Sequence, residues 1–197
     1  MNQINQTAIG TVVSDAVLTI VIRRGDLIEE PRQFPIFSAL DAAALLLAQR
    51  RNQAPIYIEA SGSAAQVLEE IKKRYSDSRD EIVNGMSPAN SAASGQVLFA
   101  NRRSELFFNF RELLGQGKLS MPAIYNEQIA AFGYEERNGK IFFLPPDEVA
   151  AKLGKYPVFA LAAVLAAIET PDKFEGPVLR AGHPGHDPLA MFEEKKK

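Results

Sequence analysis

Residues 8–24, AIGTVVSDAVLTIVIRR, decide the fold of this chain. Two β-branched runs, Ala8–Val13 and Leu18–Arg24, are separated by the polar pair Ser14-Asp15, and this pattern predicts a β-hairpin. Downstream, Leu27–Phe37 has the composition of a third strand that prolines interrupt, which is typical of a strand near the edge of a sheet. The N-terminal part of the chain therefore predicts an antiparallel unit of three strands.

The next segment alternates between helix and strand. Ser38 is the expected N-cap of a helix over Ala39–Arg51, because a hydroxyl at this position accepts a hydrogen bond from the first turn. Pro55–Ala60 predicts a short apolar strand, and Ala64–Tyr75 predicts an amphipathic helix. With a further strand at Glu81–Asn84, this order predicts an α/β fold, a central mixed sheet flanked by helices, in which a right-handed crossover joins parallel strands.

After a Gly- and Ser-rich loop at Gly85–Gln96, a helix is expected over Asn101–Gln116, which Gly117 ends. We expect the apolar stripe of this helix to be buried, and Phe108, which lies off the stripe, to be exposed. The stripe consists of Leu106, Phe107, Phe110, Leu113 and Leu114.

Asn138-Gly139 is the strongest short-range hairpin signal in the sequence, and it predicts that Ala131–Arg137 pairs with Lys140–Leu144. Two helices follow the hairpin. Pro146–Leu153 begins with Pro, Asp and Glu and ends before a glycine, as helices commonly do. Pro157–Ile168 is apolar nearly all round, so we expect it in the core.

The composition is that of an ordinary globular protein. The 197 residues include 46% apolar residues, and 22 cationic residues stand against 24 acidic ones. Because phosphate neutralisation supplies most non-specific affinity for DNA, a chain with net charge −2 would need a local basic patch to bind DNA. Cysteine is absent, which excludes disulfides and thiolate chemistry.

We expect one domain over residues 1–170 and a tail rich in Pro, Gly and charge over residues 171–197. The start of the chain lacks the basic and apolar regions of a signal peptide, and no apolar run is long enough to cross a bilayer. These features predict a cytoplasmic protein.

Two groups of motifs narrow the choice among α/β folds. Upstream, Gly10-Thr11-Val12 lies on the first strand, and the later strand ends in Glu59 before a Gly-containing turn and a helix. Downstream, Asn101-Arg102-Arg103-Ser104-Glu105 begins a helix, which is followed by Gly117–Pro122, by the hairpin, and by Asp147–Ala162. In this order, the region Ala8–Glu169 resembles the nuclease domain of phage terminase large subunits, which is ribonuclease H-like.

The resemblance implies a site for divalent metals, from which this sequence departs. Members of that family place one carboxylate on the first strand, one at the end of the later strand, and one or two at the start of the last helix, where they hold metals that activate water. Here the first-strand position is Val12, and the helix positions are Val158 and Leu161, while Tyr156 replaces the serine that caps the helix. Glu59 is the carboxylate that remains.

A lone carboxylate should hold neither magnesium nor manganese at useful affinity, since a two-metal site needs several. We therefore expect a degenerate site in which Glu59 is a remnant catalytic residue and no cofactor is bound. The competing interpretation of Glu59 is structural: its carboxylate would cap the turn or helix that follows.

An active site is the alternative. In that case Asp15, three residues beyond Val12, would join Glu59 as a ligand of Mg²⁺ or Mn²⁺, with Asp147 or Glu148 as a further carboxylate. The competing interpretation of Asp15 is a turn residue between two strands, where aspartate is favoured.

Cationic residues are candidates for contact with DNA phosphates. Arg102, Arg103 and Lys118, together with Arg111, could form one positive patch on and beside a helix. The competing interpretation is a solvated helix face that neighbouring glutamates neutralise.

The tail 171–197 contains His183, His186 and Asp187, which are ligand types suited to zinc or similar ions. Because these residues lack a scaffold, a docking tail is the favoured interpretation.

The sequence thus predicts a phage or prophage protein with a terminase nuclease-like fold, catalytically degenerate, that acts in DNA packaging as a DNA- or protein-binding module in the cytoplasm of the host cell. Its partners would be DNA or other packaging proteins, the latter reached through residues 171–197, and no membrane. The alternatives are an active metal-dependent endonuclease and a purely structural interaction domain.

Overall fold

The computed structural model describes residues 7–50, 54–59, 62–74, 82–84 and 99–168. Within this part of the chain, six strands form a mixed sheet in the order β3-β2-β1-β5-β6, and β4 also pairs with β2. The strands are β1 (Thr7–Ser14), β2 (Val17–Arg24), β3 (Leu27–Ile28), β4 (Arg32–Pro35), β5 (Ile56–Ile58) and β6 (Ile82–Asn84). The mixed sheet and its flanking helices confirm the predicted fold class.

The N-terminal hairpin is confirmed, and its turn is tight. β1 pairs antiparallel with β2 from Thr7↔Arg24 to Ser14↔Val17. Asp15 and Ala16 connect the strands with φ of 50° and 58°, as a two-residue type I′ turn requires. Asp15 is therefore a turn residue between two strands, which was one of the two interpretations of this residue.

The third strand expected over Leu27–Phe37 lies at the edge of the sheet and is interrupted at Pro31, as predicted, so it forms two separate strands, β3 and β4. β3 and β4 both pair antiparallel with β2, but Glu29–Pro31 puts three residues opposite two of β2. This extra residue forms a bulge that interrupts the ladder at the edge of the sheet.

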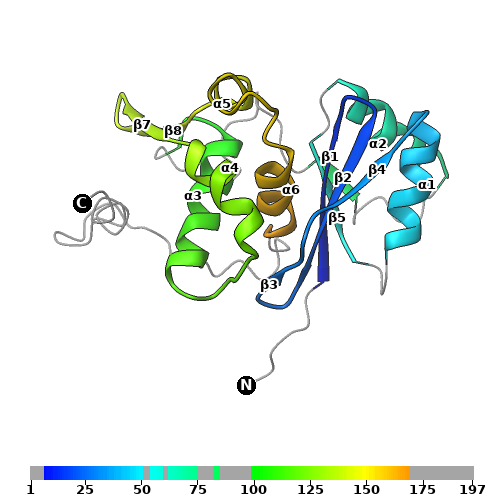
Figure 1. The fold of residues 1–197 in the computed structure, drawn as a ribbon, viewed down its shortest axis with the longest axis horizontal. Helices are drawn as coiled ribbons and strands as arrows, with labels where there is room; N and C mark the ends of the chain where they lie inside the picture. Colours follow the sequence, from blue (N-terminus) through cyan, green and yellow to red (C-terminus); the bar gives the residue numbers. More distant parts are fainter. Residues whose placement is uncertain (1–6, 51–53, 60–61, 75–81, 85–98, 169–197) are drawn as a thin grey trace.

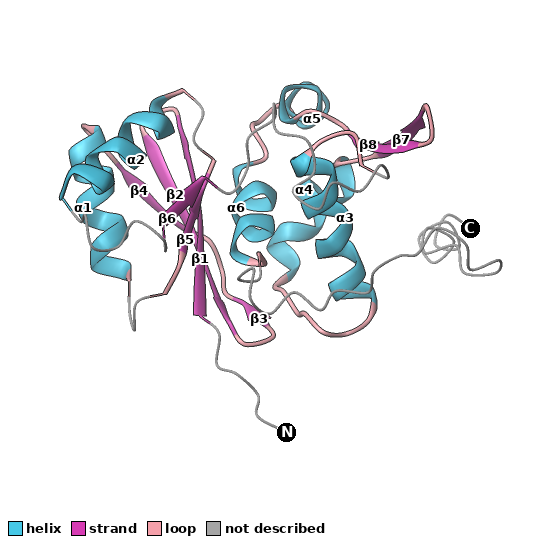
Figure 2. Cartoon of the chain, turned by 180° about the vertical axis from the view of Figure 1, so that it is seen from behind, coloured by secondary structure: helices cyan, strands magenta, loops and turns pink. Residues whose placement is uncertain are grey.

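Helices cover both faces of the sheet (Figures 1 and 2). α1 (Ala39–Gln49) and α2 (Ser63–Arg74) lie on one face, and α6 (Val158–Ala166) lies on the other. Farther from the sheet, beyond α6, lie α3 (Arg102–Gly115), α4 (Asn126–Ala131) and α5 (Pro146–Leu153). Ser38 caps α1 as predicted, since its Oγ accepts from the Asp41 amide at 3.1 Å.

Neither α4 nor the 3₁₀ turn before it, Ala123–Tyr125, could be predicted from the sequence, because elements this short display no clear hydrophobic period. Tyr125 in this turn is fully buried, and its hydroxyl donates to the carbonyl oxygen of Glu29. The turn therefore ties the helical layer to the edge of the sheet.

The second predicted hairpin is confirmed as β7 (Tyr134–Arg137) and β8 (Lys140–Phe143), which form a separate two-stranded sheet. Figure 1 shows it projecting from the helical layer. Asn138 and Gly139 both have positive φ, as the turn type requires.

On α3, Phe107 and Phe110 are buried as predicted, whereas Leu113 and Leu114 are only partly buried. The expectation that Phe108 is exposed is wrong: its ring packs against that of Phe99, with centroids 5.3 Å apart. The segment before α3 covers this second side of the helix, a tertiary contact that the period of the helix cannot reveal.

None of the described helices is both long and apolar enough to cross a membrane. The loop expected at Gly85–Gln96 and the tail 171–197, with His183, His186 and Asp187, lie outside the described residues.

Candidate functional site

Two parallel strands deliver the candidate site residues. β1 and β5 are adjacent and parallel, with Thr11 paired to Ile58, so Val12 and Glu59 follow directly after the paired part of the two strands. Because side chains alternate between faces, both residues lie on the face that α6 covers. This confirms the predicted convergence of Val12 and Glu59 near the start of the last helix.

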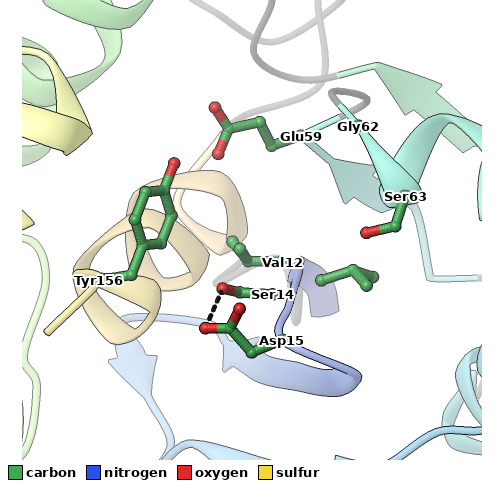
Figure 3. Close-up of a pocket in the computed structure, with 8 residues that line it drawn as sticks. Val12, Ser14, Asp15, Glu59, Gly62, Ser63 and Tyr156 are labelled. Carbon is green, nitrogen blue, oxygen red and sulfur yellow. Dashed lines mark hydrogen bonds between the residues drawn. The ribbon is translucent and has the colours of Figure 1, made fainter.

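A pocket of about 270 Å³ lies at these strand ends (Figure 3). The end of β1, the start of α2 and the residues before α6 form its walls. The lining residues are Val12, Val13, Ser14, Asp15, Glu59, Gly62, Ser63 and Tyr156.

Glu59 is buried to an unusual degree for a carboxyl group, with 5% of the residue exposed. Within the described residues, no hydrogen bond or ion pair reaches its carboxyl. The interpretation that Glu59 caps the turn or helix after it stays a prediction, because residues 60–61 of that turn lie outside the described residues. Burial raises the pKa of Glu59; the Arg103 guanidinium opposes this rise, and the Asp147 carboxylate adds to it. Ionisation of Glu59 is therefore less favourable in the folded protein than in the unfolded chain.

This pKa shift predicts how stability depends on pH. The folded protein keeps a proton on Glu59 at pH values where the unfolded chain, with a pKa near 4.5, releases it. The stability that this carboxyl contributes is therefore lost as pH rises through that window. Glu59→Gln cannot ionise, so we expect the variant to gain stability relative to the wild type as pH rises.

The measurement is urea unfolding of wild type and Glu59→Gln at several pH values, from about pH 4 to about pH 8. The gain should be smallest at the acidic end and reach a plateau above the raised pKa. A difference in unfolding free energy that does not change with pH would contradict the shift.

Tyr156 stands beside Glu59 in the pocket, and Figure 3 shows its hydroxyl on the side of the Glu59 carboxyl. Burial raises the pKa of Tyr156 to about 12, and the carboxylates of Glu59 and Asp147 contribute to the rise. The hydroxyl therefore stays protonated at neutral pH and can both donate and accept a hydrogen bond.

Asp15 lies at the other side of the pocket. Its carboxylate accepts a hydrogen bond from Ser14 Oγ at 3.2 Å, and the residue is exposed. In Figure 3, the carboxyl groups of Asp15 and Glu59 lie apart, with Val12 between them. The pocket thus contains both carboxylates of the alternative interpretation but does not bring them together.

Apolar packing occupies the rest of the site. Val12 is 3% exposed and Leu161 is fully buried, and both belong to the apolar cluster between α6 and the sheet, against which Val158 packs. In the described part of the chain, no group of three or more His, Asp or Glu side chains is placed to hold a metal ion.

The cationic candidates are not brought together on one surface. Arg103 is 6% exposed, and its Nε has no hydrogen-bond partner, while Arg102 pairs with Glu105 at 2.8 Å. Lys118 is exposed and follows the C-terminal end of α3. The 14 residues of this helix span about 21 Å, so Lys118 lies far from the two arginines at its N-terminal end.

Arg111, the fourth cation of that group, has an internal role. Its guanidinium donates to the carbonyl oxygens of Ile129 and Phe132 at 2.9 and 2.5 Å, at the end of α4. It also lies over the Phe143 ring, 5.0 Å from the centroid.

Sequence reasoning missed Ser63 and the role of Tyr156 as pocket residues. A serine directly after a Gly-containing turn at a strand end was a usable signal for Ser63, because side chains at the carboxyl ends of parallel strands share one edge of the sheet. No local pattern marks Tyr156.

This sheet, with β1 and β5 parallel at its centre and α6 packed across them, has the ribonuclease H-like fold of phage large terminase nuclease domains. The nuclease domain of the large terminase subunit gp2 of bacterial virus Sf6 superposes with a TM-score of 0.62 and 15% identity, covering 84% of this chain and 89% of that one. A mutant of the same domain with manganese gives a TM-score of 0.63.

The large terminase nuclease from thermophilic phage G20c is similar as well, with a TM-score of 0.54 and 15% identity over 81% of this chain and 80% of that one. No protein-family model matches the sequence, and neither does any curated protein sequence. The likeness therefore rests on the fold.

Proposed function

We propose that this protein is a catalytically degenerate relative of the phage terminase nuclease domains, which acts in DNA packaging as a binding module in the cytoplasm of the host cell. One observation carries the proposal. The β1 position beside Glu59, where the resemblance requires a metal-binding carboxylate, is Val12, which is buried in one apolar cluster with Leu161. Carboxylates clustered at such a position without metal would repel one another, whereas apolar side chains extend the core.

The surface charges favour a protein partner over DNA. Most exposed cations of the described chain have a glutamate as a close neighbour, which reduces the positive potential that DNA phosphates would meet. The pairs are Arg24–Glu29, Arg32–Glu29, Lys72–Glu69, Lys73–Glu70, Arg102–Glu105, Arg137–Glu135 and Lys155–Glu127. The tail 171–197 is the proposed route to other packaging proteins.

A working endonuclease is the second candidate, and one observation favours it: Asp15 and Glu59 line the same pocket. If Asp15 moved toward Glu59, the pair could share a Mg²⁺ or Mn²⁺ ion; structures of a mutant of the Sf6 gp2 nuclease domain are described with manganese and with calcium.

Nicking of supercoiled plasmid with magnesium or manganese at neutral pH separates the two candidates. We expect no cleavage by the wild type, because hydrolysis needs several carboxylates to position the metals. Glu59→Gln is the control for a contaminating nuclease. Metal-dependent nicking that disappears in this variant would establish the endonuclease, whereas equal nicking by both proteins would identify contamination.

A further inference from the structure

We propose that the pocket between Val12, Glu59 and Tyr156 binds a primary ammonium group, such as the end of a lysine side chain. The proposal rests on the loss of the metal site proposed above, and it assigns a ligand to the space that remains.

The chemistry of the lining side chains defines the ligand. Its polar side chains are three hydroxyls, of Ser14, Ser63 and Tyr156, and two carboxyls, of Asp15 and Glu59. All five can accept hydrogen bonds, and ionised carboxylates can do nothing else. None of the lining residues is an amide, lysine, arginine or histidine. A complementary ligand therefore supplies N–H donors and a positive charge.

Glu59 shows where this ligand is needed. The residue is 95% buried by the exposure already given, yet no hydrogen bond or ion pair within the described chain reaches its carboxyl. A buried carboxylate without a partner is costly, and a bound cation with N–H donors would remove much of that cost.

Arg103 does not already supply this partner. It is close enough to oppose the rise in the pKa of Glu59, but the pKa stays raised, so burial outweighs the attraction. The two side chains form no ion pair, and Arg103 is not among the residues that line the pocket.

An organic cation fits the pocket better than a metal ion. A divalent metal requires several charged oxygen ligands at short distances. Here the two carboxyl groups lie apart with Val12 between them, and the neutral hydroxyls of Ser14 and Tyr156 lie beside them (Figure 3). An ammonium group carries three diverging donors on a flexible stem and can reach acceptors on different walls.

The size of the pocket agrees with this ligand. At about 270 Å³ it lies below the ~300–1,000 Å³ that is typical of pockets for drug-sized ligands. A single extended chain with a charged end fits within such a space. Both a lysine of a partner protein and a free alkylamine present this end.

The test is a titration of the full chain with small cations at fixed ionic strength and slightly alkaline pH. Calorimetry measures the binding, and the melting temperature of the protein measures the stabilisation. The probes are N-acetyl-lysine methylamide, n-butylammonium and tetramethylammonium. We expect saturable binding and a higher melting temperature with the first two. Tetramethylammonium, which has the same charge and no N–H donor, should produce neither effect.

Variants locate the binding. Glu59→Gln should weaken binding of the ammonium probes by about tenfold or more, since it removes the buried charge. Glu136→Gln, an exposed position on β7, removes the same charge elsewhere and should change nothing. Should Glu59→Gln fail to fold, Ser63→Ala at an exposed lining position takes its place, with a smaller expected loss.

Tighter binding of the lysine derivative than of butylammonium would support a protein side chain as the source, and the reverse order would support a free amine. An equal response to tetramethylammonium, no binding of either ammonium probe, or unchanged binding by the variants would overturn the proposal. None of these outcomes contradicts the proposed loss of catalysis. Only metal binding and DNA nicking by the wild type would contradict that proposal.

Discussion

Gly10→Ala is expected to lower the free energy of unfolding by about 3 kcal/mol or more. A Cβ at this position would lie 2.0 Å from the carbonyl oxygen of Ala162 and 2.3 Å from the amide nitrogen of Ala166. Both atoms belong to the backbone of α6, so no side-chain rotation can relieve the clash. The whole helix would have to move away from β1, and its buried alanine face would lose its packing against the strand.

Gly133→Ala is the matched control for this prediction. There the added Cβ would meet only Leu144 Cδ1 at 3.5 Å, an ordinary contact. We expect a change of less than about 1 kcal/mol in urea unfolding. If Gly10→Ala were as stable as Gly133→Ala, the close packing of α6 on β1 would be wrong, and with it the position of Val12 and Tyr156 in the pocket.

Phe110→Ala is expected to cost about 3–5 kcal/mol, because the ring is fully buried and its removal leaves a cavity between α3 and the rest of the core. Phe37→Ala makes the same chemical change at a residue that is 94% exposed and should alter stability by less than about 0.5 kcal/mol. Urea unfolding of both variants measures the difference. A loss well below 1 kcal/mol for Phe110→Ala would mean that another face of α3 is buried.

Local patterns were sufficient to predict most of the sheet and helices. The type I′ hairpin at Asn138-Gly139 follows from residues that tolerate positive φ, and the cap at Ser38 follows from a hydroxyl before an apolar run. The adjacency of β1 and β5 was predictable from the strand–helix–strand order that the resemblance supplied.

The remainder depends on contacts between distant segments. Phe108 is buried because Phe99 covers a second side of α3, and the third strand is split by a bulge whose register only the partner strand fixes. Both effects come from tertiary packing, which overrides the local pattern.

In the candidate site, too, some features follow from local pattern and others depend on contacts between distant segments. The meeting of Val12 and Glu59 was predictable, because parallel strands deliver their carboxyl ends to one edge. The positions of the arginines were not predictable from the sequence. The burial of Arg103 and the hydrogen bonds of Arg111 to the end of α4 depend on where α3 packs against the rest of the helical layer. Arginine in a helical segment has the same local signature whether it faces solvent or the core.

Glu59 is a buried acid in a pocket lined by hydroxyls, and its burial bears on metal binding. Since burial raises its pKa, the site opposes the charged state that metal binding would require. A metal ion would have to overcome that cost with few other charged ligands to help.

Calorimetric titration of the wild type with manganese at neutral pH tests the central claim, the loss of the metal site, most directly. A site with Glu59 as its buried carboxylate and Asp15 held apart from it should give no saturable binding at micromolar concentrations, and Glu59→Gln should give the same heats as the wild type. Saturable micromolar binding that Glu59→Gln abolishes would contradict the claim and identify this pocket as a working metal site.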